Sequence, residues 1–370
     1  MTNSVPQVPN VVVLIPSLHP DHLLPAYVHD LIAHGYRRIV IVDDGSGPDY
    51  ADIFSGLDAL PECTVLSYEV NQGKGHALKF GMAYIAEHFP DADGIVTADS
   101  DGQHTSHDVT QVANAMITGG KGLYLGSRDF SGKDIPPKSR LGNRLTSVFF
   151  ALLYGHWLPD TQTGLRGFTL DQVPMLRTIA GNRFEYEMNM LIHYAGMHIP
   201  FHIVPIQTIY LQENKGTHFR PIRDSARIYK HLFGNFFKYA SASALSTLVD
   251  IGLFTLLNRL ILPLIISDPF QSVLWDINIV VFWATLLARV CSSLLNYRLN
   301  KSLVFRIERS RGSLIRYAML VVGVMLLSAT LVSFMSNPLQ LAATPSKIVV
   351  DTALFFANYR IQKHWVFRET

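Results

Sequence analysis

The chain has 370 residues, and its 31 lysines and arginines nearly balance its 29 aspartates and glutamates, so the net charge of +2 gives no reason to expect a nucleic-acid partner. Its two cysteines, Cys63 and Cys291, lie in different halves, which argues against a disulfide framework and a thiolate metal site. Residues 1–237 hold 18 basic and 23 acidic side chains, whereas residues 238–370 hold 13 and 6 and contain four long apolar runs. We therefore expect a soluble domain followed by a membrane domain.

The first domain begins with alternating strands and helices. Residues 11–16 form an apolar run closed by proline, residues 23–34 a helical stretch, and residues 38–42 a second apolar run. A strand–helix–strand unit implies a parallel sheet, and ligands bind such sheets beyond the carboxyl ends of the strands. Three polar residues follow the second strand at that edge: Asp43, Asp44 and Ser46. Their carboxylates are suited to a nucleotide base or ribose, and a solvated Asp-Gly turn is the alternative.

A glycine-rich turn follows the next predicted strand, residues 65–68. Gly73 and Gly75 flank Lys74 immediately before a helix that is predicted to run to about Glu87. A lysine in such a turn at a helix N-terminus suits an anionic ligand. The spacing is not that of a Walker loop, and a plain loop with a solvated lysine is the alternative.

A short buried strand at residues 94–96 leads to two aspartates, Asp99 and Asp101, with Gln103 after them. Carboxylates two residues apart can reach one hard cation, Mg²⁺ or Mn²⁺, and Gln103 can add a neutral oxygen. In isolation an acidic surface turn explains this D-x-D pattern equally well. However, three successive strand ends carry carboxylates, a Gly-Lys-Gly turn and the D-x-D pair, and one nucleotide diphosphate with a divalent cation would occupy all three.

Four arginines are predicted to hold phosphate groups, because the guanidinium fork matches phosphate geometry. Arg128 ends a strand over residues 123–128, and Arg140 and Arg144 lie in a basic, helix-favouring stretch. Arg166 closes the Asp160–Arg166 segment. A surface ion pair is the alternative for Arg144.

The end of the first domain adds further candidates. Glu187 begins a helical pattern, either as a site residue or as a carboxylate that favours a helix N-terminus. After a strand at residues 201–206, a predicted loop at 214–221 offers further phosphate contacts: Lys215, His218 and Arg220. Residues 223–238 then combine basic and aromatic side chains, which predicts an amphipathic helix on an anionic membrane face or against the soluble domain.

The apolar runs predict four membrane spans, at about residues 239–262, 277–297, 314–336 and 341–361. The loop at 298–316 and the C-terminal 360–368 are strongly basic, which places both termini and the first domain in the cytoplasm. Residues 1–10 are polar and lack a secretory signal pattern, in agreement with that orientation.

The second domain contains an internal repeat. The segment 296–305 recurs 62 residues later as 358–367 with six of ten positions identical, and Lys238-Tyr239 and Arg316-Tyr317 open the first helix of each half. The repeat predicts two tandem helical hairpins in the same orientation. Ionisable residues inside the spans are Asp250, Arg289, Lys347 and Asp351. We expect Arg289 to pair with Asp250 or Asp351, as a structural ion pair or as part of a headgroup-phosphate site with Lys347.

The patterns I-P-S, V-D-D-G-S, N-Q-G-K-G-x-A-L and A-D-S-D-G-Q over about residues 10–230 resemble family 2 glycosyltransferases with a GT-A fold, and above all those of the dolichol-phosphate mannose synthase and bactoprenol glucosyltransferase type. The resemblance implies that Asp43 holds the base, that Asp99 and Asp101 hold ribose and metal, and that Gln103 joins the metal. The segment 18–21 departs from the acidic pattern of that family. The second half resembles the GtrA-like family, which implies a domain that anchors the transferase or flips its lipid-linked sugar.

The predicted fold is therefore an α/β GT-A domain with a Rossmann-like mixed sheet, joined to an all-α membrane domain of four spans. The predicted boundaries are residues 1–220 for the transferase domain, 221–237 for the juxtamembrane helix and 238–370 for the membrane domain. Residues expected to act in catalysis are Asp101, Arg128, Arg140 and Arg166. Residues expected to bind substrates are Pro16, Asp43, Asp44, Ser46, Gly73, Lys74, Asp99, Ser100, Lys215, His218 and Arg220. The expected metal ligands are Asp99, Asp101 and Gln103.

The predicted activity is inverting transfer of a hexose from a UDP- or GDP-sugar to a polyprenyl phosphate (dolichyl or undecaprenyl) in the lipid bilayer, with Mg²⁺ or Mn²⁺. A processive polysaccharide synthase is less favoured, because such enzymes carry Q-x-x-R-W and this chain has no Arg-Trp pair. A lipid-linked sugar carrier with a non-catalytic nucleotide domain is the other alternative. The sequence leaves open the base, the sugar, the polyprenol, the choice between Mg²⁺ and Mn²⁺, flipping by the membrane domain, and assembly into a homo-oligomer.

Overall fold

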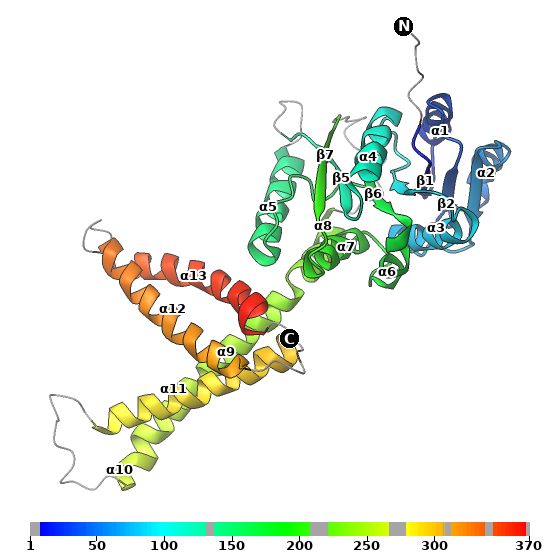
Figure 1. The fold of residues 1–370 in the computed structure, drawn as a ribbon. Coiled ribbons are helices and arrows are strands. Elements are labelled where there is room, and N and C mark those ends of the chain that lie inside the picture. Colours follow the sequence, from blue (N-terminus) through cyan, green and yellow to red (C-terminus); the bar gives the residue numbers. More distant parts are fainter. Residues whose placement is uncertain are drawn as a thin grey trace. The chain divides into compact units, whose positions relative to one another are not determined.

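A computed structural model of the protein describes residues 8–130, 137–207, 221–265, 279–305, 307, 312–336 and 343–367. The chain divides into two compact units, Met1–Leu232 and Phe233–Thr370. The first unit is a sheet covered by helices, and the second is helical (Figure 1).

The first unit is built on one seven-stranded sheet with the order β3-β2-β1-β4-β6-β5-β7. Its strands are β1 (Val11–Ser17), β2 (Ile39–Asp43), β3 (Cys63–Ser67), β4 (Gly94–Thr97), β5 (Leu123–Arg128), β6 (Arg166–Thr169) and β7 (Phe201–Ile206). Strands β1 to β4 pair in parallel, β6 is antiparallel to both of its neighbours, and β5 pairs in parallel with β7. The mixed sheet confirms the predicted architecture and brings the ends of β1, β2 and β4 to one edge.

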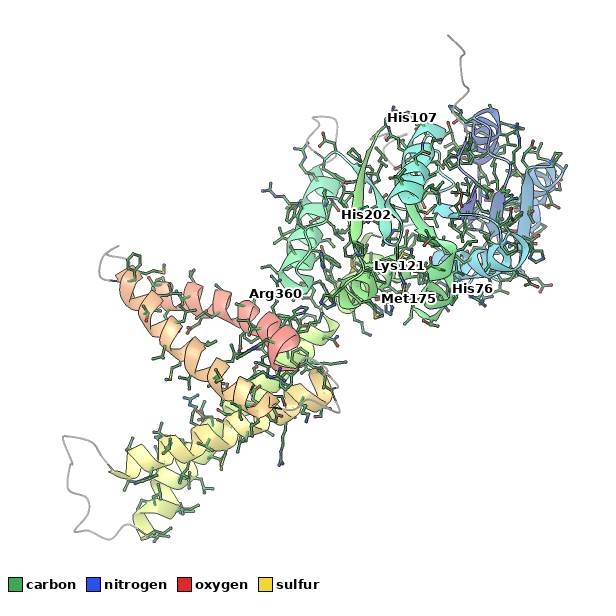
Figure 2. The ribbon with its side chains drawn as sticks, viewed as in Figure 1. His76, His107, Lys121, Met175, His202 and Arg360 are labelled. Atoms are coloured by element: carbon green, nitrogen blue, oxygen red, sulfur yellow. The ribbon has the colours of Figure 1, made fainter. Side chains whose placement is uncertain are left out.

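Strand β6 is the one strand of this sheet that the sequence patterns do not predict. Its four residues, Arg-Gly-Phe-Thr, contain no apolar run, and it exists because it pairs with both β4 and β5. Beyond it, Tyr124 on β5 is in register with His202 on β7, and their rings stack with centroids 4.3 Å apart. His202 is labelled on β7 in Figure 2.

Eight helices of the described residues belong to the first unit: α1 (Leu23–Ala33), α2 (Ala51–Asp58), α3 (Lys74–His88), α4 (Ser106–Gly119), α5 (Pro137–Tyr154), α6 (Val173–Thr178), α7 (Glu185–Gly196) and α8 (Pro221–Leu232). Helix α1 ends before Gly35, whose φ of 101° is accessible to glycine but strained for other residues. Helix α4 begins with a capping box, in which Thr105 and Asp108 each accept a hydrogen bond from the backbone of the other.

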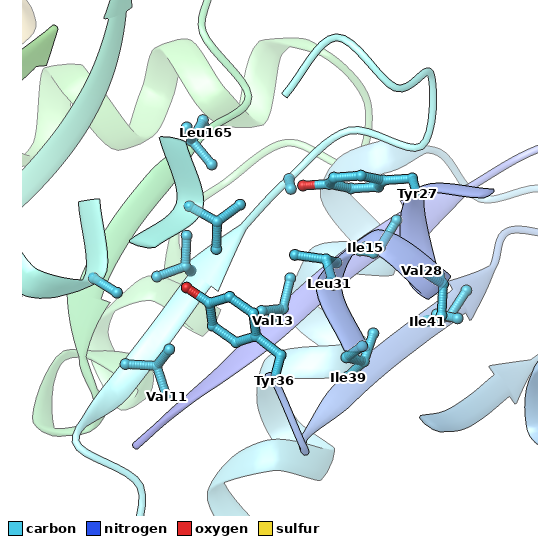
Figure 3. Packing of buried hydrophobic residues seen from close by; sticks show 14 of the residues in the cluster. Val11, Val13, Ile15, Tyr27, Val28, Leu31, Tyr36, Ile39, Ile41 and Leu165 are labelled. Atoms are coloured by element: carbon cyan, nitrogen blue, oxygen red, sulfur yellow. The ribbon is translucent and has the colours of Figure 1, made fainter. Parts of the chain in front are cut away.

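The core beside the sheet fixes the strand ends that carry the site. Val28 and Leu31 of α1 are fully buried in the same cluster as Val13 and Ile15 of β1 and Ile41 of β2 (Figure 3). Each buried aliphatic side chain of this kind contributes about 1.5–3 kcal/mol of transfer free energy. Strands β1 and β2 are therefore held rigidly up to the residues at which the polar segments begin.

The second unit consists of two helical hairpins. One contains α9 (Gly234–Leu256), the short α10 (Leu262–Ile265) and α11 (Ile279–Leu299), and the other contains α12 (Ser313–Ser336) and α13 (Ala343–Ile361). Two helical stretches, Gly234–Ile265 and Ser313–Val332, are long and apolar enough to cross a membrane. The predicted runs at 277–297 and 341–361 fall on α11 and α13, apart from their first two residues, which lie outside the described ranges.

The internal repeat is reproduced in three dimensions. Both repeated segments end in a π-helical turn, Asn300–Val304 after α11 and Gln362–Val366 after α13. Asn300 donates a hydrogen bond through Nδ2 to Gln362 Oε1 at 2.9 Å, and these two residues occupy equivalent positions of the repeat. The equivalent rings of Phe305 and Phe367 stack with centroids 5.1 Å apart. The two hairpins therefore meet through matching residues, as expected for a pseudo-two-fold pair.

The buried amide pair should couple the two hairpins energetically. We expect Asn300→Ala and Gln362→Ala each to lower the melting temperature of the full-length protein in detergent, and the double variant to add little, because both remove the same hydrogen bond. A double-mutant cycle should give a coupling of about 0.6 kcal/mol, the usual size for such bonds between membrane helices. Ser302→Ala, at an exposed position of the same π-turn, is the control. Fully additive losses would contradict the contact.

Candidate functional site

The end of β2 forms a tight polar turn. The backbone N–H of Ser46 donates to Asp43 Oδ1 at 2.8 Å, and the backbone N–H of His19 donates to Ser46 Oγ at 2.9 Å. Ser17, which follows Pro16 in β1, is in register with Asp43. The predicted substrate residues Pro16, Asp43 and Ser46 thus lie together where the first two strands end.

Asp44 fastens the glycine-rich turn to the end of β2. Its buried carboxylate accepts hydrogen bonds from Tyr68 Oη at 2.7 Å, Asn71 Nδ2 at 3.1 Å, and the backbone N–H groups of Gln72 at 2.8 Å and Gly73 at 2.9 Å. Burial, followed by this contact with Asp44, raises the pKa of the Tyr68 hydroxyl. Asp44 therefore determines where the turn lies and where the helix after it begins.

Gly73 is required at this turn. Its φ is 104°, and a Cβ there would overlap the backbone oxygen of Asn182, which precedes α7. The close approach of these two segments sets the direction in which Lys74, the first residue of α3, extends its side chain.

Lys74 is the charged centre of the cluster. Its ammonium lies 2.7 Å from Asp99 Oδ1 and 3.0 Å from Glu187 Oε2. Burial alone would lower the pKa of Lys74, but the two carboxylates outweigh that effect and raise it. Lys74 therefore joins the start of α3, the end of β4 and the start of α7. Glu187, for which a helix N-terminal role was the alternative, lies in this cluster.

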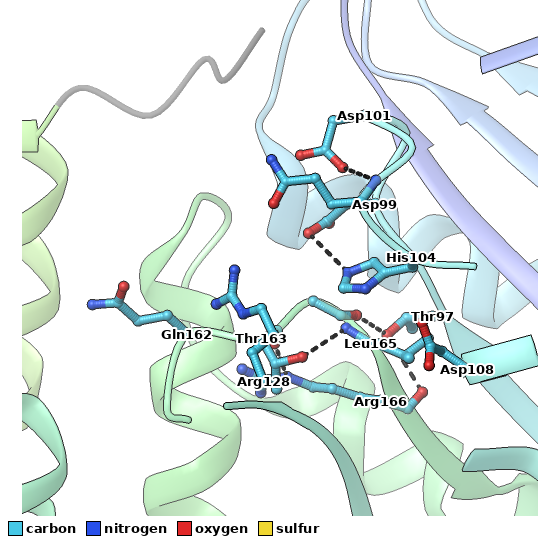
Figure 4. A network of polar contacts seen from close by, with 12 residues as sticks. Thr97, Asp99, Asp101, His104, Asp108, Arg128, Gln162, Thr163, Leu165 and Arg166 are labelled. Atoms are coloured by element: carbon cyan, nitrogen blue, oxygen red, sulfur yellow. Dashed lines mark hydrogen bonds and ion pairs between the residues drawn. The ribbon is translucent and has the colours of Figure 1, made fainter. Parts of the chain in front are cut away.

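The D-x-D segment follows β4 and lies against Lys74. The second oxygen of Asp99 lies 3.6 Å from Nε2 of the buried His104, and the backbone N–H of Gln103 donates to Asp101 Oδ1 at 3.1 Å (Figure 4). Burial would raise the pKa of Asp99, yet Lys74 and His104 lower it. Burial and the charge of Asp99 raise the pKa of Asp101. Among the described residues, Asp99 has an ion pair with Lys74, whereas none is found for Asp101.

This donor set fits a hard divalent cation in part. Within the described ranges, no three or more His, Cys, Asp or Glu side chains form a group that could hold a metal ion. Asp99 and Asp101 supply carboxylate oxygens two residues apart, and Gln103 supplies an amide. Such a set suits Mg²⁺ or Mn²⁺ when oxygens of a bound diphosphate or water complete the coordination.

Gly164 brings the Asp160–Arg166 segment against the D-x-D pair. A Cβ at Gly164 would overlap the carboxylate of Asp99, so only glycine leaves room for it. Thr97 Oγ1 donates to Gly164 O at 2.7 Å, which fixes this approach from the end of β4. The glycine of the segment therefore has a steric role that its sequence position alone does not reveal.

The four predicted phosphate arginines fall into two groups. Arg166 is buried, and it donates through Nε to Thr163 O at 2.9 Å and through Nη1 to Glu187 O at 2.8 Å. Arg128 forms a two-pronged contact with the buried Asp160, at 2.7 Å through Nε and 3.3 Å through Nη2. Arg140 and Arg144 are exposed on α5. Arg166 thus supports the start of α7, and Arg128 is oriented by a carboxylate that is itself fully buried.

The remaining site residues are one predicted serine, two residues that the sequence patterns do not single out, and three that the structure does not describe. Ser100 is half-buried between the two aspartates. His104 contacts Asp99, and Asp160 binds Arg128. The sequence places both residues within or beside a recognised motif but does not mark either as a site residue. The remaining predicted contacts, Lys215, His218 and Arg220, lie outside the described residues.

Two family models match the chain. The model of glycosyl transferase family 2 matches residues 12–179, and the model of the GtrA/DPMS transmembrane domain matches residues 238–367. The first range contains Asp43, Lys74 and the D-x-D pair, whereas Glu187 lies just beyond it. The second range contains both helical hairpins.

Two named relatives match part of the chain. The UDP-N-acetylglucosamine–dolichyl-phosphate N-acetylglucosaminyltransferase of Methanococcus voltae is 29% identical over 219 residues, which cover 55% of this chain and 86% of the relative. Glycosyltransferase AglJ of Haloferax volcanii is 24% identical over 251 residues, which cover 66% and 79%. A crystal structure of glucosyl-3-phosphoglycerate synthase from Mycobacterium tuberculosis with Mn²⁺, UDP and glucosyl-3-phosphoglycerate is similar at a TM-score of 0.46 and 14% identity, over 62% of this chain and 80% of that one.

The hydrogen bonds around Asp44 predict a measurable stability effect. Asp44→Asn keeps the shape of the side chain but turns one acceptor oxygen into an amino group that faces N–H donors. We expect the free energy of unfolding to fall by about 2 kcal/mol, because a buried acceptor of several hydrogen bonds is lost. Thermal unfolding of the full-length protein measures it, with Asp52→Asn, exposed on α2, as the control. Equal stability of the Asp44→Asn protein would refute this role.

Proposed function

Because the chain joins a glycosyl transferase family 2 domain to a GtrA/DPMS transmembrane domain, we propose that it transfers a hexose from a nucleotide diphosphate sugar to a polyprenyl phosphate at the cytoplasmic membrane face. The observation that carries this proposal is the Lys74–Asp99–Asp101 cluster at the edge of the sheet where ligands of such folds bind. The relative from Methanococcus voltae, whose name specifies a dolichyl-phosphate acceptor, supports the acceptor class.

The donor site uses the ends of three strands. Asp43 and Ser46 recognise the base and ribose, and the turn that ends in Gly73 and Lys74 lies beside the diphosphate. Asp99, Asp101 and Gln103 would hold Mg²⁺ or Mn²⁺, which would supply positive charge to the leaving diphosphate. The position of Asp99 and Asp101 two residues apart after β4 supports this role, because a cation would relieve the repulsion between the two carboxylates.

The acceptor requires little proton transfer. A polyprenyl phosphate is already an anion at neutral pH, so its oxygen attacks the anomeric carbon while the bond from that carbon to the diphosphate oxygen breaks, with inversion. Lys74 balances the charge of Asp99 and Glu187 and keeps the aspartate in one orientation. Arg128, fixed by Asp160, and the exposed Arg140 assist with phosphate charge, and the buried Arg166 positions α7.

Two helices of the first unit are suited to a membrane-bound acceptor. Tyr154 Oη, at the end of α5, donates to Leu232 O, and Thr146 lies 3.3 Å from the Tyr229 hydroxyl on α8. Helix α8 continues in the chain directly into the apolar stretch that starts at Gly234. Helix α5 exposes four apolar side chains at helical spacing, beside Arg140 and Arg144: Leu141, Leu145, Val148 and Leu152. An anionic lipid surface matches such a face.

The membrane part completes the proposal. We propose four spans in two tandem hairpins with both termini in the cytoplasm, a transferase domain at residues 1–220, a juxtamembrane helix at 221–237 and a membrane domain at 238–370. The basic segments that follow α11 and α13 support this orientation. The membrane domain anchors the enzyme and holds the lipid near the transfer site.

The proposal is tested by transfer assays on the purified full-length protein. Undecaprenyl and dolichyl phosphate are incubated with separate UDP- and GDP-hexoses and Mg²⁺ or Mn²⁺. We expect Asp101→Ala to lower the transfer rate about 100- to 1,000-fold, because it removes a group that stabilises the leaving diphosphate. Asp93→Ala, an exposed aspartate just before the same strand, should keep full activity. Unchanged turnover of Asp101→Ala would favour a lipid-linked sugar carrier whose nucleotide domain is not catalytic.

The steric role of Gly164 gives a second test. We expect Gly164→Ala to reduce the transfer rate at least about 10-fold, because the added methyl group displaces the carboxylate of Asp99 from Lys74. Gly56→Ala on α2, where a Cβ meets nothing within 4 Å, is the matched control. Steady-state kinetics over donor and cation concentration measure the effect. Wild-type kinetics in Gly164→Ala would show that the position of Asp99 is not critical.

A further inference from the structure

The first hairpin of the second unit contains an ion pair between apolar helices. Arg289 Nη2 on α11 lies 3.5 Å from Asp250 Oδ2 on α9, which confirms one of the two predicted partners of Arg289. Ser292 Oγ, also on α11, donates to Asp250 Oδ1 at 2.9 Å. The carboxylate is thus held by the opposite helix through a hydroxyl and a guanidinium.

The second hairpin contains a matching group. Ser328 Oγ on α12 donates to Asp351 Oδ1 on α13 at 2.6 Å, and Lys347 Nζ lies 2.8 Å from Asp351 Oδ2. Here too, one carboxylate joins two helices through a serine and is paired with one cation. Each hairpin therefore has one such triad of carboxylate, serine and cation.

The two triads occupy equivalent levels of the repeat. The 62-residue shift that relates Asn300 to Gln362 also relates Arg289 to Asp351. The shift between Tyr239 and Tyr317, which open the first helices, relates Asp250 to Ser328. The same layer of both hairpins is therefore polar, although the acidic residue stands on the first helix in one hairpin and on the second helix in the other.

This layer falls near the middle of the proposed spans. Arg289 and Asp351 each stand eleven residues before the paired amides Asn300 and Gln362, which corresponds to about 16 Å along a helix. The hydrocarbon core of a bilayer is about 30 Å thick. The inference below therefore rests on the proposed membrane arrangement, in which these helices span the bilayer.

The cations face outward, whereas the first carboxylate does not. The side chain of Arg289 is 68% exposed and that of Lys347 is 62% exposed, but Asp250 is only 18% exposed. The ion pair engages one nitrogen of the Arg289 guanidinium. Asp250 and Asp351 each pair with one of these cations, but the exposed part of each cation can contact a second anion, and a phosphate matches the guanidinium fork in geometry and charge.

The surroundings favour a phosphate that is attached to a lipid. Leu286, one turn from Arg289, and Val290 beside it are both exposed, so an alkyl chain has an apolar surface next to the charge. We propose that Arg289 and Lys347 are two intramembrane binding positions, one in each hairpin, for the phosphate group of a polyprenyl lipid. Each aspartate–serine pair orients its cation and leaves it available to the ligand.

The proposal is tested by counting bound lipids. Native mass spectrometry of the full-length protein is performed with undecaprenyl phosphate, with undecaprenol, which lacks the phosphate, and with undecaprenyl phosphate plus millimolar inorganic phosphate. We expect Arg289→Gln and Lys347→Gln each to lose one bound undecaprenyl phosphate per chain and the double variant to lose two. Arg289→Lys, which keeps the charge, should retain the lipid, and Arg298→Gln, exposed at the end of the same helix, is the matched control.

The outcomes separate this proposal from the transferase function. The number of bound lipids is measured without donor sugar and does not depend on turnover, so this number alone decides whether Arg289 and Lys347 bind the phosphate of the lipid. Equal lipid counts in the parent and both Gln variants would overturn the proposal, as would displacement of the lipid by inorganic phosphate or equal binding of undecaprenol. If the Gln variants bind as many lipids as the parent but no longer self-associate, the two cations contact a second copy of the chain instead of a lipid. Absence of sugar transfer by the parent protein would overturn the transferase function alone. If Arg289→Gln does not fold, the number of lipids bound by Lys347→Gln decides.

Discussion

The contact on which the first unit depends is the ion pair between Lys74 and Asp99. Two aspartates at the end of a short strand repel each other, and burial strengthens that repulsion. Lys74 compensates the charge of the first aspartate and of Glu187, and so ties three segments that are far apart in the chain. The charge of Asp101 is then left as the least compensated of the cluster, which suits a site that receives a cation together with its ligand.

The charged cluster is held in place by buried polar groups that surround it. Asp44 fixes the turn before Lys74, Gly164 leaves room for the carboxylate of Asp99, and Arg166 holds the backbone of Glu187. These contacts fix the geometry of the site before any ligand arrives. Such preorganisation lowers the cost of binding and of reaching the transition state, because little has to move. The geometry of the site therefore depends on these surrounding residues as much as on the charged residues themselves.

The second unit is built from a repeated hairpin. The repeat provides both the contact between the two hairpins and a layer of polar residues within each hairpin. Matching residues, Asn300 with Gln362 and Phe305 with Phe367, join the hairpins at one end of the repeat. Eleven residues before the paired amides, the two copies diverge in sequence, but each hairpin has a carboxylate, a serine and a cation at this level. Charges inside apolar helices carry an energetic cost, which the ion pairs and the serine hydrogen bonds of each hairpin reduce.

The sequence by itself determined which strands form, wherever a strand is an apolar run, and which polar motifs follow those strands. It also determined the contrast between the two halves and the internal repeat. All of these are local patterns of hydrophobicity and spacing. Only the tertiary structure decided that residues 166–169 form a strand, since that segment is stabilised by pairing on both sides and not by its own composition. The tertiary structure also decided which of the four arginines are held by other residues. Arg128 contacts the buried Asp160 and Arg166 donates to the backbone of Glu187, both distant in the chain, whereas Arg140 and Arg144 are exposed on one helix. The local sequence around each arginine predicts the same phosphate-binding role. Which hydrogen-bond acceptors the tertiary structure brings next to the guanidinium decides what each arginine does.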